Sequence, residues 1–262
     1  MTGESSRQGA EMFIKRNATG FADALIREAE GLKCLREALE RAGVTTVRVP
    51  DVFHVDETTL EMTGIRPAPA TPGTFSMLGE GLALMHRLEQ QSYGWGQDNY
   101  IGLSPQPNRW SHSWGDFFVR DRLAYQVGRI RDHDVQGEFA DILNRYGQKL
   151  AGWLDSACEH ASLLHGDLWS GNALFDEQVP WLIDPAVYCG DREADLAMTE
   201  MFGGFGAAFY EGYDRTYPRS PEYGRKRDIY NLYHYLNHYN LFGSGYLGGC
   251  QRGFDAILRV VR

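Results

Sequence analysis

Residues 162–198 constrain the fold of this chain more than any other stretch. They read SLLHGDLWSGNALFDEQVPWLIDPAVYCGDREADLAM, and four residues separate Asp167 from Asn172. Further along, the apolar run 181–183 ends at Asp184, directly before Pro185. A short loop between two strands holds polar side chains in place without a flexible lever. We therefore expect Asp167, Asn172 and Asp184 to converge on one site.

These three residues suit a site that transfers a phosphoryl group. Such a site needs one carboxylate beside the acceptor hydroxyl and oxygen ligands for the magnesium ions that bridge the phosphates of ATP. We predict that Asp167 accepts the proton of the hydroxyl and that Asn172 and Asp184 bind Mg²⁺. The alternative is purely local, with Asp167 capping a helix and Asn172 occupying a turn.

A lysine and a glutamate upstream complete the predicted nucleotide site. Lys15 lies on a short strand predicted at residues 11–16, and Glu28 follows on the next helix. In kinases a pair of this kind holds the α- and β-phosphates of ATP. Glu30 is the competing acidic partner, two positions along on a different face of the helix.

The first part of the chain has the pattern of a small α+β unit. After the strand, residues 21–43 have apolar side chains at helical spacing, with Gly43 as a stop signal. Two β-rich pieces follow at residues 47–55 and 58–62. We place a domain boundary near Thr63, which makes residues 1–63 a nucleotide-binding lobe.

The pattern of residues 64–262 is mostly helical, so we expect a larger catalytic and substrate-binding lobe. Helices are predicted from about residue 75 and at residues 116–131, 139–160, 193–210 and 228–242. Residues 92–114 contain too many chain breakers for a helix and too many aromatic residues for a disordered linker. They are expected to form an ordered loop.

Charge and composition exclude several classes of function. The 262 residues carry a formal net charge of −9, whereas nucleic acid and anionic membranes are bound by clustered positive charge. No apolar run approaches the length of a membrane helix, so we expect a cytoplasmic protein that acts on a small molecule. The four cysteines lack the spacing of zinc ligands. The sequence does not indicate an oligomeric state.

Three motifs, HGDLWSGN, LIDPAVYCGDREADLAM and NYIGLSPQPN, resemble the fructosamine kinase family. This family is a branch of the aminoglycoside phosphotransferase and choline kinase group. The resemblance implies a two-lobed, protein-kinase-like α+β fold that binds ATP at the joint near Glu61 and Met62. It also implies phosphorylation of the O3 hydroxyl of a ketoamine, either free or on a glycated protein, and hence deglycation.

The start of the chain departs from the family pattern. Members begin with two strands and a glycine-containing turn that cover the phosphates, but only about fourteen residues precede Lys15, and Gly3 and Gly9 do not restore the turn. We therefore expect a truncated N-terminal lobe. Two alternatives stay open: a kinase of an aminoglycoside or a choline-like alcohol, and an inactive nucleotide-binding pseudokinase.

Further residues near the motifs are candidates for substrate contacts. The indole of Trp169 could stack on a sugar ring or simply wall the pocket. Asp191 and Glu193 are expected to face the cleft and attract the amine of the substrate.

Other polar residues are expected to serve the structure. Asp195 and His165 should brace the catalytic loop, and the amides of Asn99, Gln106 and Asn108 should tie down their own loop. His234 and His238 have the spacing of two metal ligands, but packing explains them better because no third ligand is evident.

Overall fold

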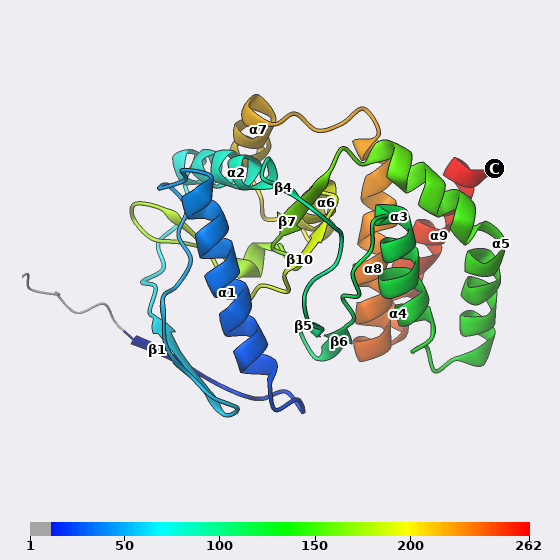
Figure 1. The fold of residues 1–262 in the computed structure, drawn as a ribbon, viewed down its shortest axis with the longest axis horizontal. Helices are drawn as coiled ribbons and strands as arrows, with labels where there is room; N and C mark the ends of the chain where they lie inside the picture. Colours follow the sequence, from blue (N-terminus) through cyan, green and yellow to red (C-terminus); the bar gives the residue numbers. More distant parts are fainter. Residues whose placement is uncertain (1–11) are drawn as a thin grey trace, which may run out of the picture.

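The N-terminal lobe is a three-stranded antiparallel sheet with one helix packed on it (Figure 1). The computed structural model describes residues 12–262, so Gly3 and Gly9 lie outside the described residues. The strands β1 (Met12–Arg16), β2 (Val52–Val55) and β3 (Thr59–Thr63) have the order β1-β3-β2. β3 ends where the sequence analysis places the domain boundary, and that division stays a prediction.

The helix of this lobe, α1 (Ala24–Arg41), forms because its apolar residues recur on one face. Leu25, Leu32 and Leu35 are buried on that face, and all three belong to one core with Leu60 of β3. The helix ends before Gly43, whose φ of 69° is readily adopted only by glycine. The predicted strand, helix and hairpin are therefore confirmed.

The second lobe begins with α2 (Pro72–His86), which packs closely on α7 (Ala207–Thr216). Glycines allow this approach, because a Cβ atom on Gly79 would lie 2.0 Å from the carbonyl oxygen of Phe209. One helix was predicted for residues 193–210, but α6 (Glu193–Met201) and α7 are separate. Gly203 and Gly204, which lie between α6 and α7, have φ values of 70° and 98°, and these values end the helical conformation there.

A bundle of helices forms the side of the molecule opposite the N-terminal sheet (Figure 1). Its core is rich in aromatic side chains, including Trp114, Phe117 and Tyr230. The segments of this bundle are α3 (Trp114–Phe117), the π-helix η1 (Phe118–Ala124), α4 (Tyr125–Val127), α5 (His133–Ala157), α8 (Tyr223–Phe242) and α9 (Leu247–Val261). The sequence predicts most of this helical content but not α9 as a separate helix.

Short strands between the lobe and the bundle carry the motifs singled out in the sequence. β7 (Ala161–Leu164) lies between β4 (Glu89–Gln90) and β10 (Tyr188–Gly190). The remaining short elements are the hairpin β5 (Asn99–Ile101) and β6 (Ser104–Gln106), the hairpin β8 (Ala173–Phe175) and β9 (Pro180–Leu182), and the 3₁₀ turns η2 (Ser170–Asn172) and η3 (Ser244–Tyr246). Residues 92–114 are thus ordered, as predicted.

Within residues 12–262, no helix is both long and apolar enough to cross a membrane. The architecture is a small sheet-based lobe followed by a larger helical lobe. This agrees with the predicted α+β class.

Candidate active site

Asp167, Asn172 and Asp184 meet between the two lobes. Asp167 lies on the loop that leaves β7, and Asn172 ends the 3₁₀ turn η2. The amide nitrogen of Asn172 donates to the Asp167 carbonyl at 2.9 Å, to Asp167 Oδ2 at 3.2 Å and to the Asp184 carbonyl at 3.4 Å. One asparagine therefore ties the two aspartate segments together.

Asp184 follows the buried strand β9 and has an unusual backbone. Among the described residues it is the only one other than glycine with a positive φ, 50°. Such conformations cost free energy and occur where the surrounding structure enforces them, often at functional sites. The half-exposed carboxylate points toward the other lobe, where Lys15 Nζ lies 3.0 Å from Asp184 Oδ1.

Lys15 links the two lobes through two carboxylates. Its ammonium donates to both carboxylate oxygens of Glu28, at 2.9 and 2.8 Å, and also contacts Asp184. Burial alone would lower the pKa of Lys15, but the two negative charges outweigh it and raise that pKa. Glu30, the competing candidate, contacts Arg27 instead, at 2.9 Å.

Asp195 and His165 brace the loop that carries Asp167. Asp195 accepts hydrogen bonds from the backbone N–H groups of His165 and Gly166, at 2.7 and 2.9 Å. His165 Nε2 lies 2.8 Å from the Ile183 carbonyl oxygen, and its Nδ1 accepts from the Asp167 N–H at 3.3 Å. Burial lowers the pKa of His165, so its ring is neutral and suited to these two bonds. The bracing roles predicted for both residues are confirmed.

Gly166 is required for this loop to pass so close to the next strand. Its φ is 83°, and a Cβ atom would lie 2.0 Å from the carbonyl oxygen of Ala186. The glycine of the HGD motif therefore fixes how near Asp167 comes to the segment that carries Asp184.

Burial raises the pKa of Asp167 to about 7, the negative charge of Asp184 adds to this effect, and the hydrogen bond from Asn172 opposes it. A carboxylate with this pKa can take up a proton near neutral pH, which is the property needed in a general base.

The hairpin of β5 and β6 clamps the segment after Asp184. Asn99 Nδ2 donates to the Val187 carbonyl at 2.9 Å, and Gln106 Nε2 donates to the Ala186 carbonyl at 3.0 Å. Asn108 Nδ2 in turn donates to Asn99 Oδ1 at 2.8 Å. The three amides are structural, as expected, and Asn108 holds its own loop through the Gln97 carbonyl. Asn99 and Gln106 differ from the expectation, because they also hold the segment that follows Asp184.

Two cavities meet at Asp167. The first, about 340 Å³, contains the predicted nucleotide residues along one wall. Its polar lining includes Lys15, Glu28, Asn99, Asp167, Asn172 and Asp184. The second, about 320 Å³, is mostly apolar and extends toward α8. Asp167 and Trp169 line both cavities, as do Gly102 and Leu103, so the two cavities adjoin at these residues.

Several aromatic residues that line the second cavity were not predicted from the sequence as site residues. Phe202 follows α6, while His238 and Phe242 lie near the end of α8. Nothing in their local sequence distinguishes them from core aromatic residues. His238 does pack against rings, as expected, but it also lines this cavity.

A third, apolar cavity of about 300 Å³ lies behind Lys15 and Asp184. Met62 lines it, together with Ile65 from the joint between the lobes. Glu61, the neighbour of Met62 on β3, is not among the lining residues, because successive side chains of a strand point to opposite faces of the sheet. The binding of ATP near Glu61 and Met62 stays a prediction.

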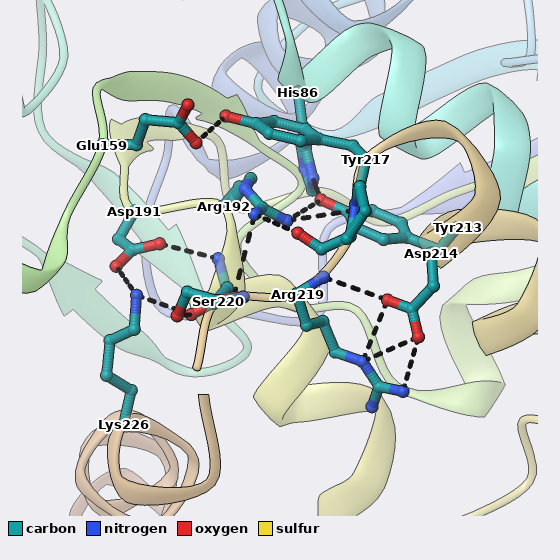
Figure 2. A network of polar contacts seen from close by, with 12 residues as sticks. His86, Glu159, Asp191, Arg192, Tyr213, Asp214, Tyr217, Arg219, Ser220 and Lys226 are labelled. Carbon is teal, nitrogen blue, oxygen red and sulfur yellow. Dashed lines mark hydrogen bonds and ion pairs between the residues drawn. The ribbon is translucent and has the colours of Figure 1, made fainter. Parts of the chain in front are cut away.

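Asp191 and Glu193 do not face the cleft, which corrects the expectation that they attract the substrate amine. They are 3% and 1% exposed and pair with buried Lys226. Lys226 Nζ lies 2.8 Å from Asp191 Oδ2 (Figure 2) and 2.5 Å from Glu193 Oε2. Glu193 also accepts from the Ser220 hydroxyl, at 2.8 Å. Their charges are already matched inside the protein, so they serve the fold.

Comparisons with known proteins identify the family. The model of the family described as fructosamine kinase matches residues 3–260. A protein named "Probable ketoamine kinase" from Vibrio parahaemolyticus is 38% identical over 94% of this chain and 84% of its own length. The "Protein-ribulosamine 3-kinase, chloroplastic" of Arabidopsis thaliana is 36% identical over 95% of this chain and 77% of its own length.

Solved structures agree with the sequence comparison. The crystal structure of a "Putative fructosamine-3-kinase" from Thermobifida fusca has a TM-score of 0.82 and 28% identity, over 97% of this chain and 87% of that one. An aminoglycoside phosphotransferase shares the fold at a TM-score of 0.53 and 16% identity, over 88% of this chain and 82% of that one. The match of the family model to nearly the whole chain, with relatives at this level of identity, means that the chain belongs to the fructosamine kinase family.

Proposed function

We propose that this chain uses ATP to phosphorylate the O3 hydroxyl of a ketoamine, either free or on a glycated protein. The observation that carries the proposal is the position of Asp167 between a polar cavity bordered by Lys15 and Asp184 and a second, mostly apolar cavity. Family membership supports the class of acceptor, because the relatives are named for ketoamine and ribulosamine.

Asp167 has the chemistry of the base. Its carboxylate would orient the hydroxyl of the acceptor and take its proton while the hydroxyl oxygen forms a bond to the γ-phosphorus. The bond between that phosphorus and the β,γ-bridging oxygen breaks, and ADP leaves with the electron pair. The hydrogen bond from Asn172 Nδ2 holds the carboxylate in one orientation for this step.

Lys15 and Glu28 are proposed to position the phosphates. The ammonium of Lys15 is held by Glu28 at one end of the polar cavity and reaches Asp184 at the other. A fixed positive charge at this place would attract the α- and β-phosphates and orient the γ-phosphate toward Asp167. Met62 would contact the adenine in the apolar cavity behind it.

Asn172 and Asp184 fit a magnesium site. The amide nitrogen of Asn172 is committed to hydrogen bonds, which leaves its oxygen as the amide atom that can bind a cation. Mg²⁺ prefers oxygen ligands and commonly takes one or two protein groups together with phosphates. When bound, it would neutralise charge on the phosphate oxygens.

A panel of acceptors tests the proposed function. ADP formation would be measured with ribulosamine and fructosamine, and with an aminoglycoside and choline as matched alcohols, all with ATP and Mg²⁺. We expect turnover of a ketoamine and a rise in Tm when ATP and Mg²⁺ are added. Turnover of only the other alcohols would refute the proposed acceptor, while absence of both turnover and a Tm shift would refute the kinase activity.

A further inference from the structure

The acceptor side of the site gathers exposed apolar side chains. Leu103, Trp169, Phe202 and Phe242 are 52%, 39%, 46% and 62% exposed, and all four line the second cavity. Large apolar side chains that remain exposed together mark a binding surface, whereas single ones do not. This surface is continuous with Asp167, which lines the same cavity.

The rings of this surface form a connected arc. The centroids of Trp169 and Phe202 are 6.4 Å apart with the rings edge to face, and Phe202 lies 5.3 Å from His238. His238 is in turn 5.5 Å from Phe242. The catalytic loop, the end of α6 and the end of α8 each contribute to the arc, so its faces are held by three separate elements.

The cavity contains little formal charge. Among its lining residues only Asp167 and His238 can ionise, and Asp167 is engaged as the proposed base. Burial lowers the pKa of His238 and outweighs the opposite effect of its hydrogen bond to the His234 carbonyl oxygen, at 2.8 Å. The ring is therefore mostly neutral near pH 7 and does not repel a cation. The carboxylates once expected to attract the amine, Asp191 and Glu193, are paired with Lys226 elsewhere.

We propose that the arc of Trp169, Phe202 and Phe242 binds the protonated secondary amine of the ketoamine through the faces of its rings. This inference rests on the proposed function. With the O3 hydroxyl at Asp167, the amine on C1 of the same sugar is near enough to reach the adjoining cavity, which Asp167 also lines. Aromatic faces carry partial negative charge and attract ammonium groups, so the arc can select a cation without a carboxylate.

Two acceptors that differ in one atom test this inference. One is an N-alkyl fructosamine, which carries the cation, and the other is the matching 1-O-alkyl fructose ether, which is neutral. We expect the wild-type protein to favour the ketoamine in kcat/KM by about tenfold. Phe202→Leu keeps apolar volume but removes the ring, so the loss in kcat/KM should be about threefold or more larger for the ketoamine than for the ether.

Control variants separate the ring from its bulk. Phe202→Tyr retains an aromatic face and should retain the preference for the ketoamine. Phe53→Leu removes a ring that is 56% exposed on β2 and lines neither cavity at Asp167. This variant should therefore leave kcat/KM unchanged for both acceptors. Equal losses on both acceptors in Phe202→Leu, or no wild-type preference, would overturn the inference and leave the proposed function standing. No turnover of any ketoamine would instead refute the proposed function.

Discussion

Two pairs of carboxylates in the same motif have different surroundings. Asp167 and Asp184 form the first pair, and Asp191 and Glu193 form the second. Asp184 shares the partly exposed Lys15 with Glu28, and both aspartates border an open cavity. The second pair is sealed around Lys226 (Figure 2). The carboxylates of Asp167 and Asp184 can still bind a ligand, while those of Asp191 and Glu193 are neutralised by basic side chains inside the protein.

A chain of polar contacts connects the two pairs. Asp195, in the helix that follows Glu193, holds the backbone of the catalytic loop and contacts His86 at 3.3 Å. His86 in turn lies 2.9 Å from the Tyr213 hydroxyl, which belongs to the buried network (Figure 2). We infer that the buried charges support the geometry of the cavity without touching a ligand.

Changing Asp167 to Asn tests the comparison most severely. The amide keeps the shape but cannot take up the proton, so turnover of a ketoamine should fall about 10²–10⁴-fold. The midpoint of urea unfolding should not fall, because the variant loses a carboxylate that burial disfavours. Asp191→Asn is the matched control and should lower stability but retain most of the turnover of folded protein. Similar losses of turnover in both variants would contradict the assignment of a catalytic role to Asp167 and a structural role to Asp191.

Changing Lys226 to Met tests the buried side. Removal of the ammonium leaves buried Asp191 without its ion-pair partner and Glu193 with only the longer contact to Arg192, at 3.9 Å. Breaking such a buried pair lowers the free energy of unfolding by about 3–5 kcal/mol. Urea denaturation followed by circular dichroism measures this loss. Arg225→Met, on the same helix but largely exposed, should change the free energy by less than about 0.5 kcal/mol. A Lys226 variant as stable as the Arg225 variant would contradict the assignment of a buried ionic network.

The pH dependence gives the smallest effect and sharpens the same comparison. Asp167 must be ionised to act as a base, and its pKa is about 7, so kcat/KM should fall about tenfold for each pH unit below that value. The effect on stability has the opposite sign. A carboxyl whose folded-state pKa is raised contributes stability at low pH, and this is lost as the pH rises from 3.8 through about 7.

The measurement is initial rate against pH, from about 5.5 to about 8.5, with the unfolding midpoint recorded at each pH. A rate that does not change across this range would argue against Asp167 as the titrating base. A loss of rate that follows a loss of folded protein would point to the stability of the chain instead.

Much of the site could be predicted because its residues lie in short, distinctive stretches. Asp167, Asn172 and Asp184 are separated by one hairpin, so their convergence follows from local geometry. The helix that carries Glu28 directly follows the strand of Lys15, and its apolar periodicity was readable. The roles of these residues in catalysis stay predictions of the proposed function.

Other features could not be read from the sequence. Asp191 and Glu193 were predicted to face the cleft because their partner, Lys226, is more than thirty residues away in the sequence. The break between α6 and α7 depends on two adjacent glycines, which an amphipathic pattern can overlook. Phe202 and Phe242 belong to separate helical segments and meet only in the folded chain.

The sequence alone determined the family, the order of strands and helices around the motifs, and which three polar side chains converge. These depend on spacing along the chain, which backbone geometry converts into position over short distances. The tertiary structure decided which carboxylates face a cavity and which are neutralised, and which aromatic rings surround the acceptor. Those outcomes depend on burial and on charges contributed by distant segments, and neither has a local signature.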